Sequence, residues 1–262
     1  MKARTFRRME RAAPWVVIFA VLLIWDLSVR VFGIKAFILP SPFLVYESFM
    51  EYRGPIMEHA IFTLTTTLMG FSLGVLVGGF LGIAIGSSRL VYAGFYPILI
   101  GINSVPKAAV VPVLVLWLGI GQPPAIATAF LLSFFPIAVN VAAGLATVEP
   151  ELEDVLRSLG ASKLDVLVKV GLPRSLPYFF ASLKVAITLA FVGAVISETL
   201  ASNDGIGYMM LQAASQFRTS LMFAGLIVIA AMGIGTYLIF AMLETRMTGW
   251  ATRKQTPQTG GG

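Results

Sequence analysis

The sequence predicts an all-α membrane protein with six transmembrane helices, and two observations support this fold class. Hydrophobic residues make up 57% of the 262 residues and charged residues only 12%, against roughly 25% charged residues in a typical soluble domain. The apolar residues also gather in runs of about the length that crosses a bilayer ~30 Å thick. These runs cover residues 14–29, 60–86, 91–118, 125–145, 177–200 and 221–243.

The first run follows a basic segment, residues 1–13. It has no small-residue cleavage site and ends with Trp25, Asp26 and Arg30, so we interpret it as an uncleaved span rather than a signal peptide. Asp26 is expected to face other helices, because a carboxylate in a membrane is costly. The connection from 33 to 59 is expected to place His59 in a loop.

The second run contains glycines at four-residue intervals: Gly70, Gly74, Gly78, Gly82 and Gly86. This spacing leaves one helix face without side chains and predicts close packing against another helix. A surface on which helices slide during transport would need the same smooth face.

The third run contains three prolines and is expected to be kinked or broken. Asn103, Ser104 and Lys107 lie near the break. A lysine at membrane depth either faces a polar interior or extends to the membrane surface. One hypothesis is that these three residues line a translocation path that favours anions; the alternative is an interfacial lysine that only orients the segment.

The fifth run ends near Glu198, which precedes Gly- and Asn-rich residues typical of a tight turn. A loop at the outer rim is the simplest interpretation, followed by a short surface helix within 207–218. The tail, residues 245–262, is expected to be disordered, which leaves 14–244 as the transmembrane domain.

Six spans place both termini on the same side of the membrane, and the basic residues indicate which side. With a cytoplasmic N-terminus, the opposite side holds only Arg30, Lys35, Arg53 and Arg218 of the lysines and arginines outside the spans. Both termini and the charged segment 149–175 are therefore expected in the cytoplasm. The net charge of +6 reflects these flanking residues, and we expect no nucleic-acid partner.

Several chemistries are excluded by residue type. The chain has no cysteine and one histidine, so disulfides and a Cys or His metal site are not expected. A membrane-embedded enzyme would need clustered His or carboxylates within the spans. A secondary transporter would need carboxylates for ion coupling, and only Asp26 and Glu198 are candidates.

The segment 149–175, called the coupling loop below, contains the stretch ELEDVLRSLGASKLDVLVKVGLP. Leu152, Val155, Leu156 and Leu159 form one apolar stripe at helical spacing, and Gly160 is placed to end this helix. A second helix is expected at 163–170. The stripe predicts either a helix lying on the membrane surface or one that docks in a partner's groove.

This pattern resembles the loop of bacterial ABC-importer permeases, which reads EAA, three residues, G, nine residues, I, one residue, LP. Here the triplet is Asp154-Val155-Leu156, followed by Gly160, Val170 and Leu172-Pro173. The triplet and the isoleucine differ from the family's pattern, whereas the glycine, the spacing and Leu-Pro match. The flanking stretches VPKAAVVPVLVLWLGIG and ISETLASNDGIGYMM resemble the sulfonate, taurine and nitrate branch of this family.

The resemblance implies a type I permease fold in the bacterial inner membrane, with the loop inserted into a cleft of a cytoplasmic ATPase. Its implied partners are two ATPase subunits, a second copy of this chain, a periplasmic or lipid-anchored solute-binding protein, and membrane lipid. It also implies that Glu198 borders the outer mouth of the path. The residues expected to transmit the ATPase movement are Glu153, Asp154, Arg157, Ser158, Gly160, Ala161, Leu172 and Pro173.

The chain contains no G-x-x-x-x-G-K-[ST] motif, so it has no P-loop for a nucleotide. ATP and Mg are expected on the partner ATPase, no cofactor is expected on this chain, and the chain is not itself expected to be an enzyme. The predicted function is import of a small organic or inorganic anion, such as a sulfonate, taurine, nitrate or an aromatic carboxylate. A pyrimidine or vitamin-precursor importer and an ion-coupled transporter remain alternatives.

Overall fold

The computed structural model describes residues 2–147 and 150–252, with the side chains of 12–147, 152 and 154–249. All regular elements within these residues are helical. They are α1 (Lys2–Val31), α2 (Pro42–Glu51), α3 (Arg53–Gly86), α4 (Arg89–Asn103), the 3-10 helix η1 (Lys107–Val110), α5 (Val111–Leu118), α6 (Gln122–Ala146), α7 (Pro150–Ser158), α8 (Lys163–Val166), the π-helix η2 (Leu167–Gly171), α9 (Leu172–Ala201), α10 (Ile206–Ser215) and α11 (Thr219–Thr252).

Five stretches of helix within the described residues are long and apolar enough to cross a membrane, in α1, α3, α6, α8–α9 and α11. The sixth expected span is broken: α4 and the η1–α5 segment meet at 75°. Pro106 has an extended backbone (φ −62°, ψ 100°) at this break, and it has no N–H for a helical hydrogen bond. The six-span fold class is thus confirmed, with the third span bent as its prolines predict.

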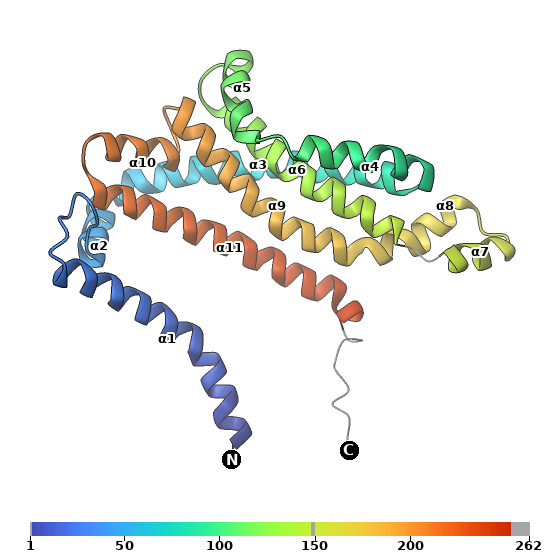
Figure 1. Ribbon diagram of the computed structural model, residues 1–262, viewed down its shortest axis with the longest axis horizontal. Coiled ribbons are helices and arrows are strands. Elements are labelled where there is room, and N and C mark those ends of the chain that lie inside the picture. Colours follow the sequence, from blue (N-terminus) through green and yellow to red (C-terminus); the bar gives the residue numbers. More distant parts are fainter. Residues whose placement is uncertain (1, 148–149, 253–262) are drawn as a thin grey trace.

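Helices α3, α6 and α9 form the centre of the bundle (Figure 1). Their contact is built from Phe71 of α3, Ile137 and Val141 of α6, and Ile187 and Phe191 of α9, all buried. Helix α11 packs on α9, and Phe71 and Phe240 have their ring centroids 5.1 Å apart.

The glycine face of α3 lies against α6. A Cβ atom built at Gly78 would be 2.8 Å from the carbonyl oxygen of Phe134, and one at Gly82 would be 2.7 Å from Cβ of Val141. Gly79, on another face, has open space around it. The two backbones therefore approach more closely than any side chain on the facing positions would allow.

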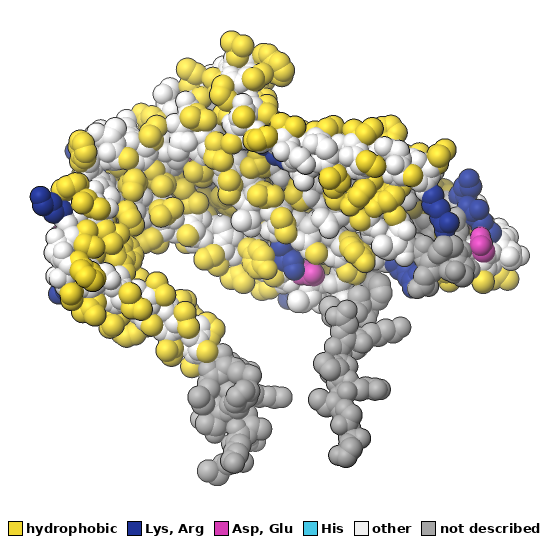
Figure 2. Space-filling view, viewed as in Figure 1, with side chains coloured by type: hydrophobic (Ala, Val, Ile, Leu, Met, Phe, Trp, Pro, Cys, Tyr) yellow, Lys and Arg dark blue, Asp and Glu magenta, His cyan; other side chains and the backbone are white. Residues whose placement is uncertain are grey.

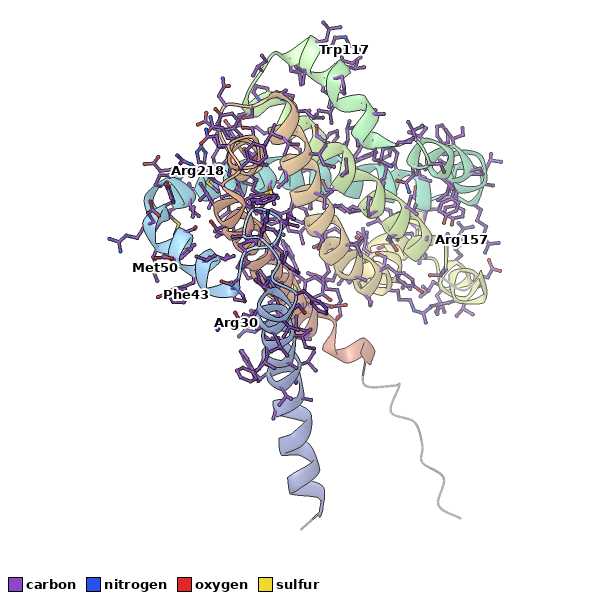
Figure 3. The ribbon with its side chains drawn as sticks, turned by 60° about the vertical axis from the view of Figure 1, so that its left-hand side comes forward. Arg30, Phe43, Met50, Trp117, Arg157 and Arg218 are labelled. Atoms are coloured by element: carbon purple, nitrogen blue, oxygen red, sulfur yellow. The ribbon has the colours of Figure 1, made fainter. Side chains whose placement is uncertain are left out.

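The two ends of the bundle differ (Figure 1). Helices α2 and α10 lie at one end, and α7 and α8 project from the other. Figure 3 shows Arg218 and Met50 at the first end and Arg157 at the second. Basic side chains gather around α7 and α8 in Figure 2.

Helix α1 diverges from the bundle (Figures 1 and 3). None of its apolar window is buried within the chain. Its C-terminal end is held by Trp25, whose Nε1 donates a hydrogen bond to the Pro40 carbonyl (3.0 Å) and whose ring is 5.8 Å from that of Phe223. The rest of α1 presents side chains such as Trp15 (73% exposed) to its surroundings.

Three sequence-based expectations differ from the structure. The connection 33–59 contains α2, begun by Ser41 as N-cap and Pro42, and His59 lies in α3 rather than in a loop. Asp26 pairs with Arg30 on its own helix (2.7 Å) instead of facing other helices. Helix α11 continues to Thr252, past the expected boundary at 245; the rest of the expected tail, 253–262, lies outside the described residues.

Candidate functional site

The coupling loop is built from two short helices joined by a sharp turn. Gly160 has φ +86°, a left-handed conformation that glycine adopts at little cost. The N–H of Ala161 donates to the Leu156 carbonyl (3.0 Å), and the N–H of Gly160 donates to the Arg157 carbonyl (2.9 Å). This arrangement ends α7 as the sequence predicts.

Helix α8 begins with a capping box. The N–H of Asp165 donates to Oγ of Ser162 (3.1 Å), and the N–H of Ser162 donates to Oδ2 of Asp165 (3.2 Å). Lys169 Nζ lies 2.6 Å from Oδ1 of the same carboxylate. These contacts fix the start of a helical rod that continues through η2 into α9.

The loop displays apolar side chains at the tip of the bundle. Val155 is 56% exposed, Leu159 79% and Leu164 69%, whereas Leu156 is half-buried. Apolar side chains gathered on a projecting, charged loop indicate a surface that binds a partner.

Polar members of the predicted coupling set surround this stripe. Asp154, Arg157 and Ser158 are exposed, and the Ser158 hydroxyl donates to the Asp154 carbonyl (2.9 Å). The side chain of Glu153 lies outside the described residues. At the other end of the loop, Leu172 and Pro173 form the first turn of α9 and are half-buried.

The second candidate region is the break between α4 and α5. Lys107 Nζ donates to the backbone carbonyl of Asn103 (2.5 Å) and to its Oδ1 (2.8 Å). The same ammonium lies 4.9 Å from the ring centroid of Phe135. Ser104 donates to the Ile100 carbonyl (3.0 Å). The structure thus brings Asn103 and Lys107 together, with Ser104 beside them, where the helix direction changes.

Glu198 lies apart from that group and is fully buried. Its Oε2 accepts hydrogen bonds from the Thr63 hydroxyl (2.9 Å) and from the N–H of Gly207 (3.0 Å). Thr63 in turn accepts from the N–H of Ile206 (2.8 Å), and His59 Nδ1 accepts from the N–H of Gly205 (3.1 Å). The carboxylate therefore joins α9, α3 and the start of α10, and it does not reach solvent within this chain.

An ion pair joins α9 and α11. Lys184 Nζ lies 2.5 Å from Oε2 of Glu244, and their side chains are 21% and 23% exposed. The sequence pattern does not predict this pair, because Lys184 lies within the fifth apolar run and Glu244 just beyond the sixth. An acidic partner is one way to stabilise a lysine within a span, and this is the signal that could have identified the pair.

Within the described residues, no group of three or more His, Cys, Asp or Glu side chains is placed to hold a metal ion. The candidate site thus has three parts: the coupling loop at one end, the break near Lys107, and the buried carboxylate near α10.

Comparison with known proteins identifies the class. Residues 74–249 match the family model described as binding-protein-dependent transport system inner membrane component. A probable ABC transporter permease protein of Haemophilus influenzae (strain ATCC 51907 / DSM 11121 / KW20 / Rd) is 30% identical over 86% of this chain and 91% of its own length.

Two further relatives have more specific names. The formylaminopyrimidine transport permease protein of Halalkalibacterium halodurans is 28% identical over 96% of this chain and 99% of its own length. The taurine transport system permease protein of Escherichia coli (strain K12) is 31% identical over 88% of this chain and 87% of its own length.

Among solved structures, a chain of the inward-facing MetNI methionine ABC transporter superposes with a TM-score of 0.63. It is 19% identical, and the match covers 76% of this chain and 97% of that one. This likeness supports the type I importer fold. The chain belongs to the binding-protein-dependent transport system inner membrane component family. It is an inner-membrane permease of an ABC importer for small solutes, and such permease subunits are not themselves enzymes.

Proposed function

We propose that this permease imports a small anion and that a separate ATPase drives it through the coupling loop. The exposed stripe around Val155 and Leu159 is the observation that supports this proposal. An apolar helix face that points away from its own bundle is stabilised when a partner covers it. A groove in a cytoplasmic ATPase subunit is a partner of the required shape.

Continuous helix connects the coupling loop to the core of the bundle and would transmit movement of the loop. Helices α8, η2 and α9 succeed one another without a break from Lys163 to Ala201. Helix α9 lies in the bundle's core against α6, so displacement of the coupling loop would displace the core rather than bend a flexible linker. Transport by alternating access requires such an element with two discrete arrangements.

The proposed assembly contains two copies of this chain, two ATPase subunits with ATP and Mg, and an external solute-binding protein. Exposed apolar surface on this chain supports the pairing of two copies. Leu116 and Trp117 of α5 are 82% and 73% exposed, and Figure 3 shows Trp117 at the tip of the molecule. In this assembly both termini lie in the cytoplasm and the translocation path lies between the two copies.

An anionic solute is favoured by the cation at the break. The Lys107 ammonium contacts Asn103 and the face of the Phe135 ring. We place Lys107, Asn103 and Ser104 on the translocation path. The sulfonate, taurine, nitrate and aromatic carboxylate classes fit such a cation. The relative that is named for formylaminopyrimidine makes a pyrimidine or vitamin precursor the second candidate.

The ATPase contact is tested with Leu159→Glu in the tagged full-length chain. A carboxylate on the apolar stripe should reduce the amount of co-purified ATPase about tenfold or more, because such a loss corresponds to only about 1.4 kcal/mol of binding. The matched control is Leu211→Glu, which makes the same substitution at an exposed leucine of α10. It should leave the amount of co-purified ATPase unchanged. Full retention of the ATPase by Leu159→Glu would contradict the proposal.

The anion preference is tested with Lys107→Glu in proteoliposomes that contain the complete transporter. Uptake of an anionic solute should fall about tenfold or more because the reversed charge repels it, while ATPase co-purification stays normal. Lys35→Glu, which changes an exposed lysine within the α1–α2 connection, is the control. Normal anion uptake by Lys107→Glu would contradict a role of Lys107 in the path. Uptake of a pyrimidine by both the original transporter and Lys107→Glu would favour a pyrimidine or vitamin precursor as the solute.

A further inference from the structure

A cavity of about 730 Å³ lies where the coupling loop meets the end of the bundle. Its walls come from the α3–α4 turn, the C-terminal end of α6, and the helices α7, α8 and η2. The residues that face it from the turn are far in sequence from those of the loop. The cavity therefore exists only in the folded chain.

Basic side chains line the cavity. They are Arg89, Arg157 and Lys163, and among the lining residues that the structure describes the acidic one is Asp154. Within the part of the chain that the structure describes, Arg89 and Lys163 form no ion pair. Like charges that converge on a concave surface raise the local potential and attract an anion.

The start of α4 adds to this potential. Ser88 is its N-cap residue but makes no side-chain capping hydrogen bond, and the first turn contains no acidic residue. The N–H groups of a helix's first turn lack helical partners and carry partial positive charge. Ser87, Ser88 and Tyr92 also line the cavity, and the Ser87 hydroxyl donates a hydrogen bond to the Ala84 carbonyl (2.9 Å).

Apolar residues also line the cavity. They are Leu145, Val166 and Leu167; Val166 is buried, and Leu145 belongs to the core of the bundle. The cavity lies at the level where α3 and α6 end, which is the membrane surface in the proposed topology. A ligand that matches both the basic and the apolar lining residues has a charged oxyanion group and an apolar part.

We propose that this cavity binds a phosphate-bearing anion, namely the headgroup of an anionic phospholipid from the cytoplasmic leaflet. Basic pockets between spans on the cytoplasmic side are suited to such headgroups. Guanidinium and ammonium groups bind the phosphate, and the apolar lining residues contact the start of the acyl chains. This inference rests on the cytoplasmic placement of the coupling loop in the proposed function, but not on the identity of the transported solute.

The test measures thermal unfolding of the purified full-length chain in detergent. Phosphatidylglycerol, phosphatidylcholine and inorganic phosphate are each added separately. Phosphatidylglycerol should raise the unfolding midpoint by about 2–4 °C more than phosphatidylcholine does. The double variant Arg89→Gln/Lys163→Gln should lose this difference, whereas the matched control Lys35→Gln/Arg53→Gln, which removes two cations from the other end of the molecule, should retain it.

Each outcome bears on the inference. A shift with phosphatidylglycerol alone supports the lipid headgroup as ligand. An equal shift with inorganic phosphate supports a phosphate site but overturns the lipid as its source. An absent shift, or one that the Arg89→Gln/Lys163→Gln variant retains, overturns the site. Because the measurement needs neither the ATPase nor transport, failure here is distinguishable from failure of ATPase docking by Leu159→Glu.

Discussion

At the scale of single residues, the role inferred for Glu198 from the sequence differs from the role that its contacts in the folded chain indicate. The sequence places it at the end of a span, next to a turn, where it could line a path. The structure encloses it between α3 and α10, where Oε2 accepts two hydrogen bonds and Oε1 has no partner among the described residues. This geometry favours a role in anchoring the start of α10, and the role in the path remains the alternative.

We expect Glu198→Ala to lower the free energy of unfolding by about 1–3 kcal/mol, since it leaves the N–H of Gly207 buried without an acceptor. Glu198→Gln should stay within about 0.5 kcal/mol of the original chain or exceed it, because the amide oxygen can accept both hydrogen bonds without a buried charge. Thermal unfolding in detergent measures both variants.

Glu47 is exposed, and Glu47→Ala is the control for this comparison. It should have little effect on the unfolding midpoint. Equal stability of Glu198→Ala and the original chain, together with a loss of solute uptake, would instead assign Glu198 to the path.

At the scale of secondary-structure elements, the α3–α6 contact depends on the missing side chains of α3. The five-glycine face meets α6 along its length, and α6 in turn packs on α9. The contact therefore fixes the helix that continues into the coupling loop. Its geometry also explains why the adjacent residues Gly78 and Gly79 differ in the space available for a side chain.

We expect Gly78→Ala to destabilise the chain by about 1–3 kcal/mol, because the added Cβ would lie 2.8 Å from the Phe134 carbonyl oxygen and the helices would have to separate. Gly79→Ala adds the same atom in open space and should be neutral or stabilising by up to about 1 kcal/mol, since alanine favours helix. Unfolding midpoints of the two variants, measured side by side, test this; equal values would contradict the packing role of the stripe.

At the scale of the whole molecule, the bundle separates two kinds of surface. The coupling loop and the basic cavity lie at one end, and α2 and α10 lie at the other (Figure 1). The proposed function requires these ends to face opposite sides of the membrane. The distribution of lysine and arginine predicts that the coupling-loop end faces the cytoplasm.

The absence of cysteine allows a direct test of this orientation. Ser162→Cys in the coupling loop should be protected from a membrane-impermeant maleimide in spheroplasts and be labelled in inverted vesicles. Gln216→Cys, at the end of α10, should show the reverse pattern, because it lies at the other end of the bundle. Labelling of both cysteines from the same side would contradict the six-span topology.

Several features of this protein are determined by local sequence. The apolar runs predict the spans, and the prolines near Lys107 predict the break. The stripe and Gly160 predict the α7 turn, whose φ of +86° is a property of a few consecutive residues. Such features follow from periodicity and backbone preference, which act over one or two helical turns.

Other features were decided only by the tertiary structure. Glu198 gains Thr63 as a partner, Lys184 gains Glu244, and Arg89 comes to share a cavity with Lys163. These residues are separated by long stretches of chain, and each pair depends on the angles and depths at which helices pack. The sequence by itself determined which segments cross the membrane and where the coupling loop turns, because those depend on local apolar length and backbone conformation. Only the packed bundle decided which charges meet, because their pairing is a property of neighbouring helices and not of any one of them.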